Sequence, residues 1–267
     1  MHIQNKIIVL DEALINKIAA GEVIERPASI VKELIENSID ADAKKIVIEV
    51  KEGGKSFIKV SDDGEGMSKK DANLSWQRHT TSKIKELNDL FSVRTLGFRG
   101  EALASIASIS KLSIITKPRG ELSGTKIVIE GGKLVMEEEF GCPDGTIIEV
   151  KELFYNTPVR KKYLKSIEQE LGQIADIVTR YALIHHKIHF KLSNNGKILL
   201  ESPSVADPIT NFSHIYGKEA AKQMLRVDYQ DEIKISGYIS KPSLARATKN
   251  EQSIYVNKRY IKKNTEI

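Results

Sequence analysis

Apolar residues recur along the chain at two spacings, one typical of helices and one typical of strands. Helical spacing predicts helices over residues 11–20, 27–38, 68–78, 100–110, 166–184 and 209–221. Alternating apolar and polar residues predict strands over 45–51 and 55–61, several short strands between 111 and 150, a hairpin turning at 194–196, and strands near 225–229, 233–239 and 253–256. This order is not the regular strand and helix alternation of a doubly wound sheet.

Glycine, proline and serine refine the ends of these elements. Gly21 is expected to end the first helix, and Pro27 suits the first turn of the second, where no amide hydrogen is needed. Ser68 is a suitable N-cap for the third helix. The segment 202–208 has two prolines and no strong period, so we predict a linker there. It separates a first domain, residues 1–201, from residues 209–267, which are too few to stand alone and are expected to be the truncated N-terminal part of a smaller α/β domain.

The composition is that of a globular protein. The 267 residues are 40% apolar, which is enough for a sizeable core and excludes collagen-like, disordered and low-complexity classes. No uncharged stretch is long enough for a membrane span, and the N-terminus lacks the features of a signal peptide. Cys142 is the only cysteine, which excludes an intrachain disulfide and fits a reducing compartment. We therefore expect a soluble protein that is not exported by the signal-peptide route.

The positive charge is concentrated at one end of the sequence. The net charge is +5, and the residues from Lys241 onward carry seven basic and two acidic side chains, so this segment accounts for the whole excess. A concentrated basic segment favours a phosphate-backbone partner more than diffuse charge does. A solvated charged surface explains it equally well, and the sequence leaves both interpretations open.

Glu33 and Asn37 lie four residues apart on the second predicted helix, so they share one of its faces. A carboxylate in this place can orient and deprotonate a water, and an amide oxygen one turn later can bind a hard cation. Most helical pairs of this kind are solvated surface residues, so this pair is a weak signal by itself.

Two glycine-containing segments add further candidates. Asp62 directly follows a predicted strand and precedes glycines, including Gly66, that let a flat ligand approach the backbone. Its carboxylate therefore suits the exocyclic amine of a base. An ordinary acidic turn or a calcium loop is the alternative. Residues 97–103 form a glycine-bracketed turn entering a helix, whose free amides suit phosphate. Residues 78–83 just upstream are rich in hydroxyl and cationic donors, although a flexible surface loop has the same composition.

These segments, taken together and in order, resemble the MutL family of DNA mismatch repair proteins. The resemblance is carried by IAAGEVIERP at residues 18–27, KELIENSID at 32–40, GFRGEAL at 97–103 and LFYNTPVRKK at 153–162, and it extends from about Leu10 to the end of the sequence. That family belongs to the ATPase superfamily of gyrase, the large heat-shock chaperone and histidine kinases. The resemblance implies an α+β fold, a two-layer sandwich of the Bergerat type with helices on one face of a mixed, mostly antiparallel sheet.

The resemblance also implies roles for particular residues. Glu33 corresponds to the general base that activates water for attack on the γ-phosphate of ATP, Asn37 to the magnesium ligand, and Asp62 to the aspartate that reads adenine. The other implied nucleotide contacts are Gly66 against the base, Thr146 beside the aspartate, Thr81, Ser82 and Lys83 in a lid, and the phosphate-binding segment of Gly97, Phe98, Arg99 and Gly100. Few groups suffice, because phosphoryl transfer mainly requires positioning and charge stabilisation.

Three features depart from the family pattern. Asp42 replaces a common glycine, and Asp63 replaces the usual asparagine, which adds negative charge near the nucleotide and is expected to weaken its binding. A His-Pro-x-Lys segment, whose lysine reaches the γ-phosphate in family members, does not occur in this sequence.

We therefore expect a mismatch repair ATPase that binds ATP with magnesium, hydrolyses it slowly, and couples nucleotide state to self-association and to DNA. The DNA candidates are Arg160, Lys161, Lys162, Lys258, Arg259, Lys262 and Lys263. A mismatch-recognition protein and other repair factors are the expected partners, without a membrane, in the prokaryotic cytoplasm or a eukaryotic nucleus.

Three alternatives remain at this point. In the first, the chain binds ATP and DNA but hydrolyses little ATP, because the second-domain lysine is absent. In the second, it is a topoisomerase subunit or a kinase of the same superfamily. In the third, it only recruits other repair proteins. The segments 97–103 and 153–162 argue against a topoisomerase or a kinase.

Overall fold

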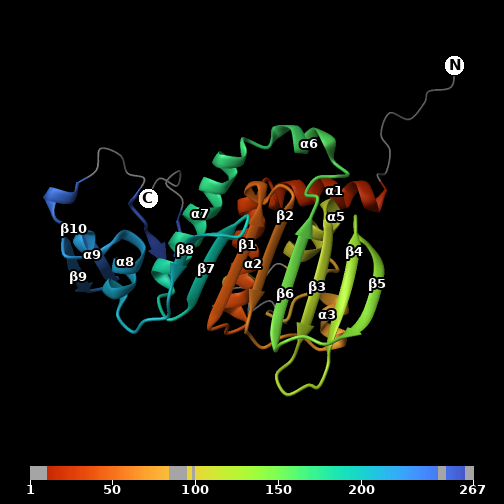
Figure 1. Ribbon diagram of the computed structural model, residues 1–267, viewed down its shortest axis with the longest axis horizontal. Helices are drawn as coiled ribbons and strands as arrows, with labels where there is room; N and C mark the ends of the chain where they lie inside the picture. Colours follow the sequence, from red (N-terminus) through yellow and green to blue (C-terminus); the bar gives the residue numbers. More distant parts are fainter. Residues whose placement is uncertain (1–10, 84–94, 98–99, 246–250, 262–267) are drawn as a thin grey trace.

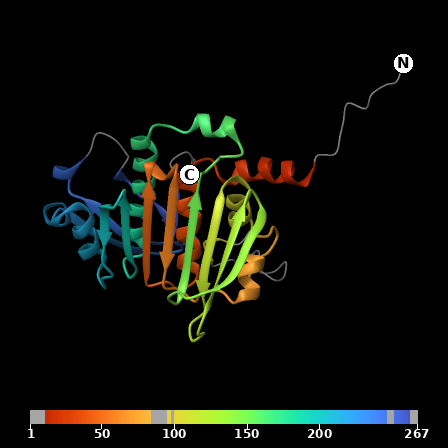
Figure 2. The ribbon, with the colours of Figure 1, turned by 45° about the vertical axis from the view of Figure 1, so that its right-hand side comes forward.

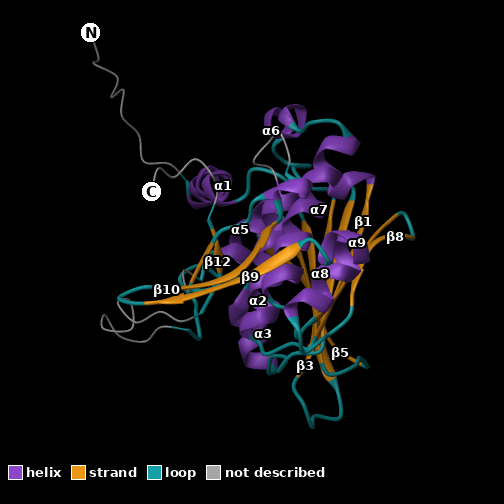
Figure 3. Ribbon diagram, turned by 90° about the vertical axis from the view of Figure 1, so that its left-hand side faces the viewer, coloured by secondary structure: helices purple, strands orange, loops and turns teal. Residues whose placement is uncertain are grey.

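The computed structural model describes residues 11–83, 95–97, 100–245 and 251–261. Within these ranges, an eight-stranded sheet is covered on one side by helices, and smaller elements follow at the C-terminal end (Figure 1). Figure 3 shows the sheet edge-on with the helices gathered to one side of it. No helix in the described ranges has the length and apolar content needed to cross a membrane.

The sheet has the strand order β5-β4-β3-β6-β2-β1-β7-β8. Its strands are β1 (Lys45–Lys51), β2 (Phe57–Asp62), β3 (Lys111–Lys117), β4 (Gly124–Glu130), β5 (Lys133–Phe140), β6 (Gly145–Lys151), β7 (His189–Asn194) and β8 (Lys197–Ser202). All neighbouring strands run antiparallel except β1 and β7, which are parallel. The expected mixed, mostly antiparallel sheet is confirmed.

The described helices before β7 are α1 (Glu12–Val23), α2 (Pro27–Asp40), α3 (Lys69–Ser75), α5 (Ala102–Ile109), α6 (Pro158–Tyr163) and α7 (Ile167–Ile184), of which α6 lies beyond the end of the strands and has no buried residue (Figure 1). Two predicted helix ends are wrong. The first helix continues past Gly21, because Ala20 and Ile24 on either side are fully buried and their burial outweighs the low helix propensity of glycine. The third ends at Ser75, and the Thr80 hydroxyl lies within hydrogen-bond distance of the Leu74 carbonyl in its final turn and of the Gln77 carbonyl just beyond it.

The core lies between the sheet and these helices. On β1, Ile46, Ile48 and Val50 alternate with exposed or half-buried residues, and they belong to the same apolar cluster as Ile30 and Leu34 of α2. On the other face, β1 and β2 present polar side chains such as Glu49 and Lys59, which form an ion pair of 3.1 Å directly across the strands. Among the described segments, no helix lies in front of this face in Figure 2. The predicted coverage of one face by helices is therefore confirmed.

The chain after β8 forms a separate set of small elements. They are α8 (Pro208–Tyr216), α9 (Lys218–Ala221), β9 (Met224–Gln230), β10 (Lys234–Ser240), β11 (Tyr255–Val256) and β12 (Arg259–Tyr260). The single helix predicted over 209–221 is wrong, because Gly217 has a φ of +92° that interrupts it. Residues 203–207, inside the predicted linker, are in neither a helix nor a strand, and the division into two domains stays a prediction.

Candidate functional site

Helix α2 presents three polar side chains along one face. Glu33, Asn37 and Asp40 are separated by four and three residues, so they follow one another up the helix, while the opposite face is buried in the core. The ammonium of Lys83 lies 3.0 Å from the Asn37 Oδ1 atom and 2.6 Å from the Asp40 Oδ2 atom. Two oxygens of α2 thus converge on one cationic group, and the sequence predictions for Asn37 and Lys83 meet at this point.

Asp40 is a site residue to which sequence analysis assigned no role. Its carboxylate is largely buried and accepts hydrogen bonds from the backbone amides of Leu96, at 2.9 Å, and Gly97, at 3.0 Å. It therefore connects α2 to the start of the glycine segment that was predicted to bind phosphate. Its spacing of three residues from Asn37, on the same helix face, is the signal that points to it.

Glu33 lies one turn before Asn37 and is partly open to solvent, with 25% of its side chain exposed. Its Oε1 atom lies 3.0 Å from the ammonium of Lys32, which also reaches Glu36 at 3.1 Å. A partly exposed carboxylate held by a neighbouring cation can both orient a water and accept its proton. The geometry suits the role predicted for Glu33.

Asp62 ends β2 beneath this helix. It accepts hydrogen bonds from the Ser38 hydroxyl, at 2.8 Å, and from the backbone amide of Gly64, at 2.9 Å. Burial raises the pKa of Asp62, and the bonds from Ser38 and from the backbones of Gly64 and Thr146 oppose that shift. A carboxylate has about four lone-pair positions, so Asp62 can still accept from a ligand amine.

The loop after Asp62 packs against the ends of β3 and β6. Gly66 has a φ of +71°, and a Cβ atom there would lie 2.1 Å from the carbonyl oxygen of Lys117, so only glycine fits. The Thr146 hydroxyl lies 3.0 Å from that of Thr116, which accepts a hydrogen bond from the Met67 amide. The register pairs Thr146 with Asp62 directly, so the predicted neighbours Asp62, Gly66 and Thr146 come together.

The predicted phosphate segment and lid are described in part. A Cβ atom on Gly97 would lie 3.4 Å from the ammonium of Lys83, whereas Gly100 has a φ of +62° and packs against the Thr80 carbonyl. Thr81 and Ser82 are exposed, and the Thr81 hydroxyl accepts a hydrogen bond from the Lys83 amide. Phe98 and Arg99 lie outside the described residues.

Asp63, which is expected to add negative charge near the nucleotide, contributes to the raised pKa of Asp62 and also has a structural role. Its Oδ1 atom accepts hydrogen bonds from the backbone amides of Lys44, at 2.7 Å, and Lys45, at 2.8 Å, so it caps the start of β1. Asp42, the other departure from the family pattern, has a φ of +58°. That left-handed conformation favours glycine, which explains why glycine is common there.

The DNA-binding candidates that the structure describes belong to two separate segments of the chain. Arg160, Lys161 and Lys162 belong to α6, which precedes α7, whereas Lys258 and Arg259 lie beside the last turns of α7. Helix α7 has 18 residues and is about 27 Å long at 1.5 Å per residue. The Arg259 guanidinium donates to the Thr95 carbonyl at 2.5 Å, close to the glycine segment. Lys262 and Lys263 lie outside the described residues.

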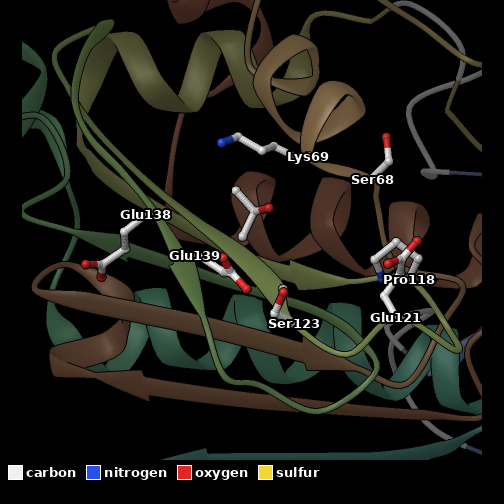
Figure 4. A pocket seen from close by; sticks show the side chains of 9 residues that line it. Ser68, Lys69, Pro118, Glu121, Ser123, Glu138 and Glu139 are labelled. Atoms are coloured by element: carbon white, nitrogen blue, oxygen red, sulfur yellow. The ribbon is translucent and has the colours of Figure 1, made fainter.

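A polar hollow of about 280 Å³ lies beyond the Gly66 loop, between α3 and the edge strands (Figure 4). It is lined by Ser68, Lys69, Pro118, Glu121, Ser123, Gly124, Thr125, Glu138 and Glu139. None of the predicted nucleotide contacts lines it. Three glutamates against one lysine make it unsuitable for a polyphosphate.

The mixed sheet has helices on one face, and the polar side chains of α2 lie beside the end of β2. This arrangement is that of an ATPase fold. A family model described as histidine kinase-, DNA gyrase B- and HSP90-like ATPase matches residues 25–139. A second model, described as the C-terminal domain of DNA mismatch repair proteins, matches residues 212–266.

Individual proteins give the same result. The DNA mismatch repair protein MutL of Streptococcus thermophilus is 51% identical over 258 residues, which are 96% of this chain and 40% of that protein. A crystal structure titled as the N-terminal domain of a DNA repair protein is 30% identical, with a TM-score of 0.79 over 93% of this chain and 78% of that one. The MutL ATPase domain of Aquifex aeolicus complexed with ADP is 28% identical, with a TM-score of 0.70 over 91% and 85% of the two chains.

The chain belongs to the MutL family of DNA mismatch repair proteins, and its first part is an ATPase domain of the gyrase B and histidine kinase class. It spans about 40% of the length of the curated relatives it matches.

Proposed function

We propose that this chain binds ATP with magnesium and hydrolyses it slowly, as the ATPase module of a mismatch repair protein. The observation that carries the proposal is the convergence of Asn37 and Asp40 on a single cation, one turn from the partly exposed Glu33. The fold neighbour from Aquifex aeolicus, which was solved with ADP, supports a nucleotide as the ligand.

Each residue then has a defined task. Glu33 orients the attacking water and accepts its proton, Asp62 accepts a hydrogen bond from the adenine amine, and Gly66 lets the base approach the backbone. The Thr146 backbone donates a hydrogen bond to Asp62, and the segment of residues 97–100 holds the phosphates. Thr81, Ser82 and Lys83 form the lid over them.

Magnesium fits the oxygens of Asn37 and Asp40, because both atoms already hold a cationic ammonium at hydrogen-bond distance. When bound, it neutralises charge that develops on the phosphate oxygens. Asn37 is the ligand proposed from the family motif. The Lys83 ammonium has to leave this position before the metal enters, which links lid movement to nucleotide binding.

We also propose that ATP favours association of two such modules and a DNA-binding state, because a ligand shifts a population through its higher affinity for one state. DNA contacts through Arg160, Lys161, Lys162, Lys258, Arg259, Lys262 and Lys263 act on the backbone without reading sequence. Within the whole protein, a mismatch-recognition protein and other repair factors are the partners, at the bacterial nucleoid.

Phosphate release by this chain, measured with and without magnesium and with and without DNA, tests the enzymatic proposal. We expect slow, magnesium-dependent release. Binding of ATP without any release would favour the alternative of a nucleotide- and DNA-binding module with little turnover, and absence of ATP binding would refute both. DNA affinity is measured over a range of salt concentrations; an affinity that does not change with salt would refute the backbone contacts.

A further inference from the structure

A buried tyrosine on α7 contacts the helix that carries the proposed base. Tyr181 is only 4% exposed, and its hydroxyl donates a short hydrogen bond to the Oε1 atom of Glu36 on α2. Glu36 is 7% exposed and lies between Glu33 and Asn37 in the sequence. Neither Tyr181 nor Glu36 has a place in the proposed nucleotide contacts.

The second carboxylate oxygen of Glu36 is linked to Glu33 through the ammonium of Lys32. The Lys32 ammonium lies 3.1 Å from the Glu36 Oε2 atom and 3.0 Å from the Glu33 Oε1 atom. Lys32 thus bridges a buried carboxylate and a partly exposed one. The four side chains form an unbroken series from α7 to the proposed base: Tyr181, Glu36, Lys32 and Glu33.

The directions of the hydrogen bonds are well defined. Burial, together with the adjacent Glu36, raises the pKa of Tyr181 above its usual range, so the phenol keeps its proton and donates it. Glu36 receives one donor on each oxygen, which is what a buried carboxylate requires. A lysine has a long flexible side chain, and a rigid buried partner restricts where its ammonium can lie.

We propose that Tyr181 is a positioning residue for Glu33: it holds Glu36, which fixes the Lys32 ammonium and thereby the orientation of the base. This inference rests on the proposed ATPase function. Tyr181 itself touches no reacting atom. Its removal therefore affects the rate of hydrolysis, because small displacements of a catalytic group are costly, and leaves nucleotide affinity unchanged.

The test compares two tyrosine to phenylalanine variants of this chain. Tyr181→Phe removes the hydroxyl that holds Glu36. Tyr255→Phe is the matched control, because that hydroxyl donates at 2.8 Å to the carbonyl of Arg180, the residue next to Tyr181 on the same helix turn. We expect kcat to fall about ten-fold or more in Tyr181→Phe, with ATP affinity within two-fold of the parent, and both values to stay within two-fold in the control.

A double-mutant cycle with Lys32→Met separates positioning from a general loss of structure. If Tyr181 acts through Lys32, adding Tyr181→Phe to Lys32→Met lowers kcat much less than Tyr181→Phe does alone. Independent, multiplying effects would overturn the proposal, as would an unchanged kcat in Tyr181→Phe. Thermal melting of all variants checks that they are folded.

Crystal structures of the parent and of Tyr181→Phe keep the inference testable if the parent shows no hydrolysis. Absence of turnover by the parent is a failure of the proposed function, and the structures then decide the inference separately. Loss of the contact between Lys32 and Glu33 in the variant supports it. An unchanged contact, with Glu36 in place, overturns it.

Discussion

Residues 11–202 and residues 208–261 of this protein are stabilised in different ways. The first region buries an extensive apolar cluster between its sheet and its helices. In the second region, Asn211 is the only buried residue among those described, and its partners belong to the first region: the carbonyl of Ala182 at 2.7 Å and the hydroxyl of Ser202 at 2.5 Å. The second region is therefore held by docking onto α7 and β8 and not by an apolar core of its own.

The residues of the proposed site are also distributed unequally between the two regions. Every proposed catalytic and nucleotide-binding residue precedes β7, whereas the described residues after 207 contribute basic side chains and exposed aliphatic ones such as Ile235 and Ile239. A rigid core can hold a carboxylate in a productive orientation, and a weakly buried region can move without disturbing it. Four predictions test this contrast, and they are arranged from the largest expected effect to the smallest.

The largest effect is expected when the proposed base is removed. Glu33→Ala is expected to lower kcat for ATP about 10²–10⁴-fold, because general base catalysis contributes that much, with nucleotide binding largely unchanged. Glu232→Ala, in the exposed turn between β9 and β10 of the second region, is the control and is expected to have no effect. Phosphate release and ATP binding are measured on both variants. Equal turnover in Glu33→Ala would refute the catalytic assignment.

A pair of isoleucine truncations compares the two regions directly. Ile48→Ala in β1 removes a fully buried side chain and is expected to lower the free energy of unfolding by about 2–5 kcal/mol. Ile235→Ala in β10, where the residue is 54% exposed, is expected to change it by about 0.5 kcal/mol or less. Urea titration monitors both. Similar losses would show that the second region has a cooperative core.

The third prediction concerns acid stability at the junction of the two regions. Burial, with Lys258 of the second region as a further cause, lowers the pKa of His185 from 6.5 to about 4. Between these pH values, His185 is therefore protonated in the unfolded chain and neutral in the folded chain. The stability contributed by neutral His185 is present above pH 6.5 and is lost as the pH falls toward 4, by at most about 3 kcal/mol.

His185→Phe is expected to reduce this dependence, measured as the change in the free energy of unfolding between pH 7 and pH 4. His79→Gln removes an exposed histidine and is the control. An equal dependence in the parent and in His185→Phe would contradict the assignment.

The smallest effect is expected at the docking contact itself. Ser253→Ala removes the hydroxyl that accepts a hydrogen bond from Arg180 at 2.7 Å, while Arg180 keeps its ion pair with Asp176. We expect a loss of about 1 kcal/mol, confined to the β11 and β12 segment and visible as faster amide exchange there. Ser243→Ala, which removes an exposed hydrogen bond to Gln223, is the control. Faster exchange throughout the sheet would show that the regions are tightly coupled.

The sequence predicted helix starts correctly wherever one residue and its neighbours determine the local backbone conformation. Pro27 begins α2, and Ser68 and Ser166 accept hydrogen bonds at the N-termini of α3 and α7 as such residues ordinarily do. Gly21 and Gly217 show the limit. Gly21 was expected to end a helix, but α1 continues through it, because the residues that flank it are buried. Gly217 was placed inside a predicted helix, and it interrupts that helix.

The candidate site divides in the same way. The spacing of Glu33 and Asn37 places them on one helix face from sequence alone, and the strand end at Asp62 could be located without the fold. The spacing from Asn37 also places Asp40 on this face, but its contact with the Gly97 amide could not be found from the sequence. The contact of Glu36 with Tyr181 and the contact of Asp63 with the start of β1 could not be found either, since each joins residues far apart in the chain.

The sequence by itself identified the family through its short motifs, and that resemblance implied the mixed sheet with helices on one face and the residues proposed to handle the nucleotide. Apolar periodicity located most of the individual helices and strands. Only the tertiary structure decided which charges meet. It placed Lys83 between Asn37 and Asp40, brought Arg259 to the Thr95 carbonyl, and joined Tyr181 to Glu36. Such contacts join residues dozens of positions apart, and they form only when the sheet brings its helices together around one core.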